Sequence, residues 1–232
     1  MDAIPAGTRL VYVTLSHQFP LGMSMSLPRR MALLAWAQRH HAAIVKDDYD
    51  SEFRYGGRPI EPLQTLDTGG RVIYVFSKTM LPSLRLGFVV APASLRGAVR
   101  AAKFVTDWHT ALPTQAALAR FIDQGLFARH VRKMRAIYHA RHEQIVEVLT
   151  RQFAGHLEVV PSAAGLHLTA TAPTASTQEL DAVLGRASAA GVEALALSMH
   201  SIPARPGLVL GYGAIPTERI GEGLRRLRRC FD

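Results

Sequence analysis

Short apolar runs and helical patterns alternate along the first half of the chain. Apolar residues at consecutive positions predict strands over residues 10–16, 42–46, 71–77 and 84–92. The segment 27–41 (LPRRMALLAWAQRHH) predicts a helix between the first two strands. Strand, helix and strand joined by short connections are typical of βαβ units in a mostly parallel sheet. Because the runs are continuous, the pattern favours strands covered on both faces.

From about residue 93 the pattern becomes helical, and it then predicts a second, smaller α/β layer. Helices are expected over 94–105, 113–123, 126–150, 177–190 and 217–229, and strands near 157–160, 166–170, 192–197 and 207–212. We place a domain boundary within the long helix. Residues 1–130 then form one α/β domain, and residues 131–232 form a small C-terminal α/β domain.

The amino-acid composition excludes several classes of protein. Of the 232 residues, 48% are hydrophobic and 19% are charged, which excludes disorder and provides for a buried core. The single cysteine, Cys230, excludes a disulfide scaffold and a cysteine-based zinc site. No apolar run reaches the roughly 18 residues of a membrane span, and the N-terminus has no signal-peptide pattern. We expect a cytoplasmic protein that does not bind membranes.

The charge balance is basic, with 27 lysines and arginines against 18 acidic residues. Such a balance is found in nucleic-acid-binding proteins. It is also consistent with an arginine-rich, solvated surface, because the arginines are spread along helical segments and only Arg225, Arg226, Arg228 and Arg229 form a dense cluster. Both interpretations stay open.

Two groups of reactive side chains follow neighbouring strands. Asp47 and two further aspartates follow strand 42–46, and Ser77 and Lys78 directly follow the run VIYVF (72–76). Ligands of open α/β sheets bind at the carboxyl ends of the strands. Desolvation at such a position lowers the pKa of a lysine, and a lysine of lowered pKa can form a Schiff base with a carbonyl. The alternative is a lysine whose amine reaches solvent.

The acidic group suits a pyridine ring. A carboxylate such as that of Asp47 can keep a pyridine nitrogen protonated, which makes the ring an electron sink. Tyr49, two residues further on, would project to the same side and could donate to a ring oxygen. The guanidinium of Arg85 suits a phosphate. Each of these residues, taken alone, also fits a solvated loop or surface.

Other chemistries have little support in the sequence. There is no P-loop and no G-x-G-x-x-G after a predicted strand, which disfavours a nucleotide site. There is no G-x-S-x-G elbow of a hydrolase. The histidines show no metal-ligand spacing with acidic partners, so we expect no metal site.

Taken together, the motifs resemble a known family. SHQFPLG (16–22), KDDYDSEFRY (46–55) and FSKTMLPSLRLGFVVAP (76–92) resemble the aminotransferase-like domain of MocR-type regulators in the GntR superfamily, as do residues 109–149 and 203–227. The resemblance implies the fold type I of pyridoxal-phosphate (PLP) dependent class I/II aminotransferases. Residues 1–130 would be the second half of the PLP-binding large domain, and 131–232 the small domain.

The resemblance also implies roles for five residues. Lys78 matches the lysine that holds PLP as an internal aldimine, and Asp47 the aspartate that pairs with the pyridine nitrogen. Tyr49 matches the tyrosine that binds the ring's 3-hydroxyl. Arg85 matches the phosphate-binding arginine, with Ser77 as the neighbouring hydroxyl. Because fold type I sites are built at a dimer interface, the resemblance implies a homodimer.

Several features depart from the family pattern. Val75 stands where the family has threonine or serine, which removes a possible phosphate contact. The strand that in related aminotransferases carries an arginine for the substrate carboxylate reads GLVLGY (207–212), although Arg205 lies just upstream. The first half of the large domain and the winged helix-turn-helix precede the matched region in the family. We therefore expect a truncated form of a longer regulator.

Three functions follow as hypotheses. The first is a sensory domain, in which a small amino compound acts as effector and DNA is bound only through an N-terminal domain absent from this chain. The second is a PLP-dependent aminotransferase, with the amino compound as substrate. The third is a non-functional remnant.

Overall fold

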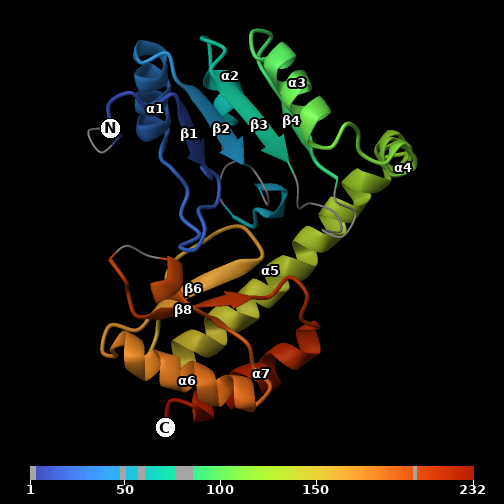
Figure 1. Ribbon diagram of the computed structural model, residues 1–232. Helices are drawn as coiled ribbons and strands as arrows, with labels where there is room; N and C mark the ends of the chain where they lie inside the picture. The colour runs from blue at the N-terminus through green and yellow to red at the C-terminus, as the bar shows by residue number, and fades with distance from the viewer. Residues whose placement is uncertain (1–3, 48–50, 57–60, 77–85, 201–202) are drawn as a thin grey trace. The chain divides into compact units, whose positions relative to one another are not determined.

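The computed structural model describes residues 4–47, 51–56, 61–76, 86–200 and 203–232 (Figure 1). The chain divides into two compact units, and neither is a single stretch of sequence. The first unit comprises Met1–Gln18, Ser24–Glu52 and Gly57–Val131, and the second comprises Phe19–Met23, Phe53–Gly56 and Arg132–Asp232.

The first unit is built on a four-stranded sheet in the order β1-β2-β3-β4. Its strands are β1 (Leu10–Val13), β2 (Ala43–Asp47), β3 (Val72–Phe76) and β4 (Phe88–Val90). β2 pairs in parallel with both β1 and β3, whereas β4 pairs antiparallel with β3. The sheet is mostly parallel, as the alternation of strand and helix predicts.

One face of this sheet is covered by α1 (Leu27–Arg39) and α2 (Leu63–Leu66). The alternation along β2 places Ile44 on this covered face, fully buried. Buried apolar residues from both helices pack with it: Leu33, Leu34, Trp36, Ala37 and Leu63. The opposite face of β1 is open among the described residues, since Leu10 and Tyr12 are 57% and 62% exposed. At β1 the expected cover is therefore present on one face only, whereas Ala43 and Val45 of β2 are partly buried on the other face.

Two further helices of the first unit, α3 (Arg96–Thr106) and α4 (Leu112–Asp123), bury none of their described residues. Large apolar side chains on these helices and in the turn between them are instead 49–80% exposed. We call this surface the α3–α4 face, and its residues are Phe104, Val105, Trp108, Leu112 and Ile122.

The second unit contains an antiparallel sheet in the order β5-β6-β8-β7. Its elements are α5 (Leu126–Gln152, shared with the first unit), β5 (Glu158–Val159), β6 (His167–Thr171), α6 (Thr177–Ala189), β7 (Leu195–Ala196), the 3-10 turn η3 (Leu197–His200), β8 (Gly207–Gly211) and α7 (Thr217–Arg229). β7 is shorter than predicted, because only two of its residues pair with β8 before η3 begins.

The core of the second unit joins α5, α6 and α7 to the sheet. Four leucines of this core are fully buried: Leu149, Leu168, Leu208 and Leu227. The start of α6 is fixed by Ser176, whose hydroxyl accepts from the backbone N–H of Glu179 while the Glu179 carboxylate accepts from the backbone N–H of Ser176. No helix in the described ranges is both long enough and apolar enough to cross a membrane.

The loop that follows β1 is tied down by a buried arginine on α1. Arg30 is 1% exposed, and its guanidinium donates to three backbone carbonyls. Nε reaches the carbonyl of Met25 at 2.8 Å, Nη1 that of Glu61 at 2.9 Å, and Nη2 that of Leu15 at 3.1 Å. One side chain therefore connects both ends of the loop with the segment that leads into α2.

We predict that Arg30→Met lowers the free energy of unfolding by about 3 kcal/mol, because three backbone carbonyls lose a buried charged donor. Denaturant unfolding followed by circular dichroism would measure the change. The matched control is Arg29→Met at the neighbouring exposed position, which should cost less than about 0.5 kcal/mol. Equal stability of the two variants would contradict the role assigned to Arg30.

Candidate functional site

The carboxyl ends of β1, β2 and β3 lie at one edge of the sheet, because the three strands are parallel. Asp47 is the last residue of β2, and its backbone lies beside that of Val75 in β3. The sequence predicts that Asp47 directly follows a strand ending at residue 46. In the structure Asp47 pairs with Val75, so β2 is one residue longer at this end than predicted. Lys78 follows Val75 by three positions in the sequence.

The structure places one of the five predicted site residues, Asp47. The other four, Tyr49, Ser77, Lys78 and Arg85, lie outside the described residues. Their roles remain predictions. What the structure adds is the environment of the Asp47 carboxylate and the anchoring of the segments on either side of it.

Tyr12 holds one oxygen of the Asp47 carboxylate. Its hydroxyl, on the open face of β1, donates a hydrogen bond to Asp47 Oδ2. Desolvation, this hydrogen bond and the negative charge of Asp47 together raise the pKa of Tyr12 to about 12. Tyr12 is therefore a neutral phenol at physiological pH, and it fixes the orientation of the carboxylate.

The other oxygen, Asp47 Oδ1, is buried and has no hydrogen-bond partner within the described part of the chain. A buried carboxylate oxygen without a donor is costly, so such a position calls for a donor from elsewhere. A protonated pyridine nitrogen provides a donor together with a positive charge. The carboxylate of Asp47 therefore fits the ring of PLP.

The sequence analysis does not predict Tyr12 as a site residue, because it interprets LVYV (10–13) only as part of an apolar strand. The available signal was register: once β1 and β2 are paired in parallel, Tyr12 and Asp47 fall on the same face of the sheet. Two buried polar residues lie close by in the sequence. Lys46 is 1% exposed on the face covered by α1, and His17 is 2% exposed in the loop after β1.

The continuation of the β1 loop is bound within the second unit. Phe19–Met23 begins two residues after His17 and belongs to that unit. The Pro20 carbonyl accepts a hydrogen bond from the hydroxyl of Thr169, and it lies 3.1 Å from Nε2 of His167. The ring of Phe19 packs 5.1 Å from the His167 ring. We call Phe19–Met23 the first strap.

A second strap, Phe53–Gly56, begins six residues after Asp47 and also belongs to the second unit. The backbone N–H of Tyr55 donates to the carbonyl of Ala163 at 2.8 Å. The Tyr55 ring stacks on His139 at 5.2 Å between ring centroids, with 15° between the planes. Its hydroxyl lies 3.1 Å from that of Tyr212. Both chain segments that adjoin the site in sequence are thus held by the second unit.

The sequence and the fold match a known family. The family described as aminotransferase class I and II matches residues 4–198. The chain belongs to the aminotransferase class I and II family. Its site residue Asp47 lies within the matched region, and its mixed sheet followed by a small antiparallel layer is the fold of these proteins.

Among solved structures, the multiple substrate aminotransferase of Thermococcus profundus is 30% identical, with a TM-score of 0.87. This similarity covers 96% of the present chain and 56% of that one. The complex of Pyrococcus horikoshii kynurenine aminotransferase with PMP gives the same TM-score at 27% identity. Fold type I is therefore the fold of this chain, and PLP is the cofactor that the family implies.

The curated relatives include transcriptional regulators. The probable rhizopine catabolism regulatory protein MocR of Rhizobium meliloti is 42% identical over 99% of this chain and 47% of its own length. The uncharacterized HTH-type transcriptional regulator YhdI of Bacillus subtilis is 36% identical over 96% of this chain and 48% of its own length. The chain spans about half the length of the curated relatives it matches.

The pairing of Tyr12 with Asp47 predicts a titration. In the folded protein Tyr12 should lose its proton near pH 12, two units above an ordinary tyrosine, and Asp47→Asn should return its pKa toward 10. Since the folded pKa is raised, the pair stabilises the fold fully below pH 10 and ceases to do so as the pH rises through 12. Ultraviolet titration of the wild type against Tyr12→Phe isolates this group. A wild-type Tyr12 that titrates near pH 10 would contradict the pairing.

Proposed function

We propose that this chain is the PLP-binding, effector-sensing domain of a MocR/GntR-type transcriptional regulator. The observation that carries the proposal is the buried and unpartnered Oδ1 of Asp47, oriented by Tyr12 at the carboxyl edge of the sheet. When bound, PLP withdraws electrons from the carbon of an attached amino compound. The residues of this chain bind the ring and determine its charge.

Each residue has a separate part in that proposal. The Asp47 carboxylate holds a proton on the ring nitrogen, and Tyr12 keeps the carboxylate in place. Lys78 supplies the amine that attaches the cofactor. The remaining three contacts are assigned by the resemblance: Tyr49 to the ring hydroxyl, and Ser77 and Arg85 to the phosphate. The effector would be a small amino compound, since a primary amine can displace the lysine.

Sensing is favoured over turnover by the interior of β8. Val209 lies in the strand where related aminotransferases carry an arginine for the substrate carboxylate, and it is 2% exposed beside Thr169. An apolar side chain there gives no ion pair to a keto acid, which weakens the binding that net transamination requires. The alternative function is a PLP-dependent aminotransferase, which the similarity to aminotransferases of 27–30% identity supports.

The proposal includes an organisation of the whole regulator. Residues 1–130 would be the second half of the PLP-binding large domain, and 131–232 the small domain. DNA would be bound by an N-terminal domain of the kind that the name of the HTH-type relatives indicates. Such a protein would work in the cytoplasm, where it meets both DNA and the amino compound.

An absorption spectrum tests the cofactor site. After addition of PLP, the purified wild type should show a visible band that Lys78→Ala lacks. Asp47→Asn should bind PLP at least tenfold more weakly, because a buried charged hydrogen bond is lost. The matched control is Asp123→Asn on the exposed end of α4, which should bind as the wild type does. No band in the wild type would overturn the proposal and favour the remnant.

We also propose that the chain forms a homodimer through the α3–α4 face. Exposed apolar surfaces of this kind mark protein interfaces, and aromatic residues dominate their binding energy. Phe104 and Trp108 pack against each other with ring centroids 5.3 Å apart, which gives the face a preformed aromatic pair. In the sequence from Lys103 to Arg120, Asp107 is the only acidic residue.

The double variant Phe104→Ser/Trp108→Ser should raise the dimer dissociation constant at least tenfold, since two aromatic anchors are lost. Analytical ultracentrifugation over a concentration series gives the constant. Leu195→Ser/Met199→Ser removes two exposed apolar side chains of the second unit and serves as the control. A monomeric wild type, or a dimer that survives the first variant unchanged, would disprove this interface.

A further inference from the structure

Four cations occupy the exposed side of the first half of α5. Arg129, Arg132, Lys133 and Arg135 are exposed and take part in no ion pair among the described residues. Arg132 lies three residues after Arg129 and three before Arg135, and Lys133 lies four after Arg129, so the four side chains lie within one half of the helix circumference. No acidic residue occurs between Asp123 and Glu143. We call these four residues the α5 basic stripe.

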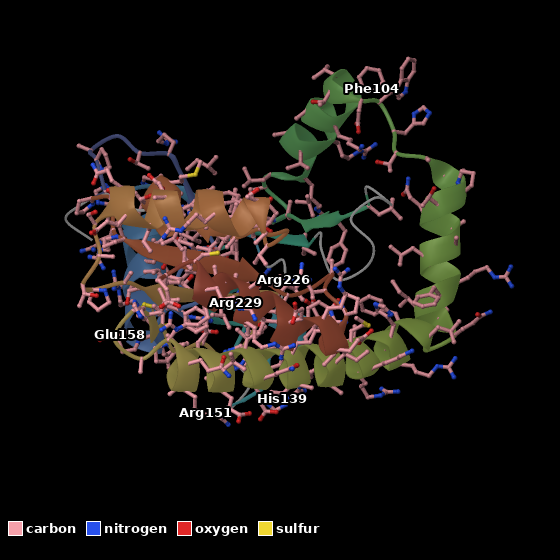
Figure 2. The ribbon with its side chains drawn as sticks, turned by 90° about the horizontal axis from the view of Figure 1, so that it is seen from below. Phe104, His139, Arg151, Glu158, Arg226 and Arg229 are labelled. Carbon is pink, nitrogen blue, oxygen red and sulfur yellow. The ribbon has the colours of Figure 1, made fainter. Side chains whose placement is uncertain are left out.

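The second half of the same helix shows what a solvated surface of this protein looks like. There His139 lies 3.4 Å from Glu143, and Arg151 lies 2.8 Å from Glu147, each one turn apart. Figure 2 shows His139 and Arg151 along the outer edge of α5. Opposite charges alternate in this half, so neighbouring side chains compensate one another. The basic stripe has no such compensation.

The stripe is unfavourable for the helix that carries it. Like charges three or four residues apart repel each other and destabilise a helix. Cations near a helix N-terminus also oppose the helix dipole, and Arg129 lies in the first turn of α5, which begins at Leu126. Four uncompensated cations therefore contribute nothing to folding. They do create a strong local attraction for a polyanion.

We propose that the α5 basic stripe binds the phosphate backbone of double-stranded DNA. The stripe extends over seven residues, so its first and last Cα atoms are about 9 Å apart along the helix, which is close to the rise of three base pairs. Arginine and lysine side chains are long enough to reach several phosphates from such a surface. The inference rests on the proposed function, because a regulator held at its operator brings this domain close to DNA.

A membrane surface is the less favoured occupant. Helices that lie on membranes carry exposed bulky apolar residues beside the basic ones. In α5 the large apolar side chains next to the stripe are only half exposed or less: Leu126, Phe127, Val131 and Met134. The stripe is thus basic without an adjoining apolar edge, which suits the phosphates of a duplex.

The test is fluorescence anisotropy with a labelled 30-base-pair duplex of random sequence, titrated with the full chain at several salt concentrations. Binding through three or four phosphates should weaken roughly 40- to 150-fold between 50 and 200 mM salt. The variant Arg129→Gln/Arg132→Gln/Lys133→Gln/Arg135→Gln should bind at least tenfold more weakly at 50 mM salt. Circular dichroism should show it folded, because glutamine is a good helix former.

A control of the same net charge separates the stripe from the general basicity of the protein. Arg219→Gln/Arg225→Gln/Arg226→Gln/Arg229→Gln removes four exposed charges from α7, two of them already paired with Glu222. It should keep most of the DNA affinity. Figure 2 shows Arg226 and Arg229 on α7.

Three results would overturn the proposal. They are no binding of DNA by the wild type at 50 mM salt, an equal loss in the two quadruple variants, or stripe-dependent binding of anionic phosphatidylserine vesicles without binding of DNA. The PLP spectrum of the same preparations distinguishes this failure from failure of the proposed function. A chain that binds PLP but not DNA would lose only the stripe assignment.

Discussion

The parallel pairing of β2 with β1 on one side and β3 on the other is the constraint on which the site depends. It brings three strand ends to one edge, and it places Asp47 beside Val75 and on the same face as Tyr12. The position of the carboxylate is then set by backbone hydrogen bonds rather than by a flexible loop. A rigid carboxylate is suited to hold a ring nitrogen in a single protonation state.

The covered and open faces of the first unit have different energetic characters. The α1 side is a packed core, in which Ile44 and Ala37 are fully buried. Leu10 and Tyr12 on the opposite face of β1 are exposed, and so are the apolar residues of the α3–α4 face. Exposure of this amount of apolar area is unfavourable in water and is relieved by association.

Much of the fold could be predicted from the sequence, because periodicity and strand–helix alternation are local signals. The end of β2 and its acidic residue can be predicted in the same way, so the sequence alone indicates Asp47 as a site residue. The hydrogen bond from Tyr12 could not be predicted, since it depends on the register between two strands and joins residues that are 35 positions apart in sequence. Apolar patterns also predicted α3 and α4 as helices, but periodicity does not reveal what covers an apolar side.

Because it includes the two straps, the second unit is not one continuous segment of the chain. A fragment cut at the long helix, comprising residues 132–232, would carry the whole antiparallel sheet but neither strap. Thr169 would lose the carbonyl of Pro20 as its acceptor, and the carbonyl of Ala163 would lose the N–H of Tyr55. The C-terminal fragment 132–232 is therefore not a complete folding unit. Gene fusion or recombination at this helix would transfer an incomplete fold, and a functional graft would have to carry the straps along with it.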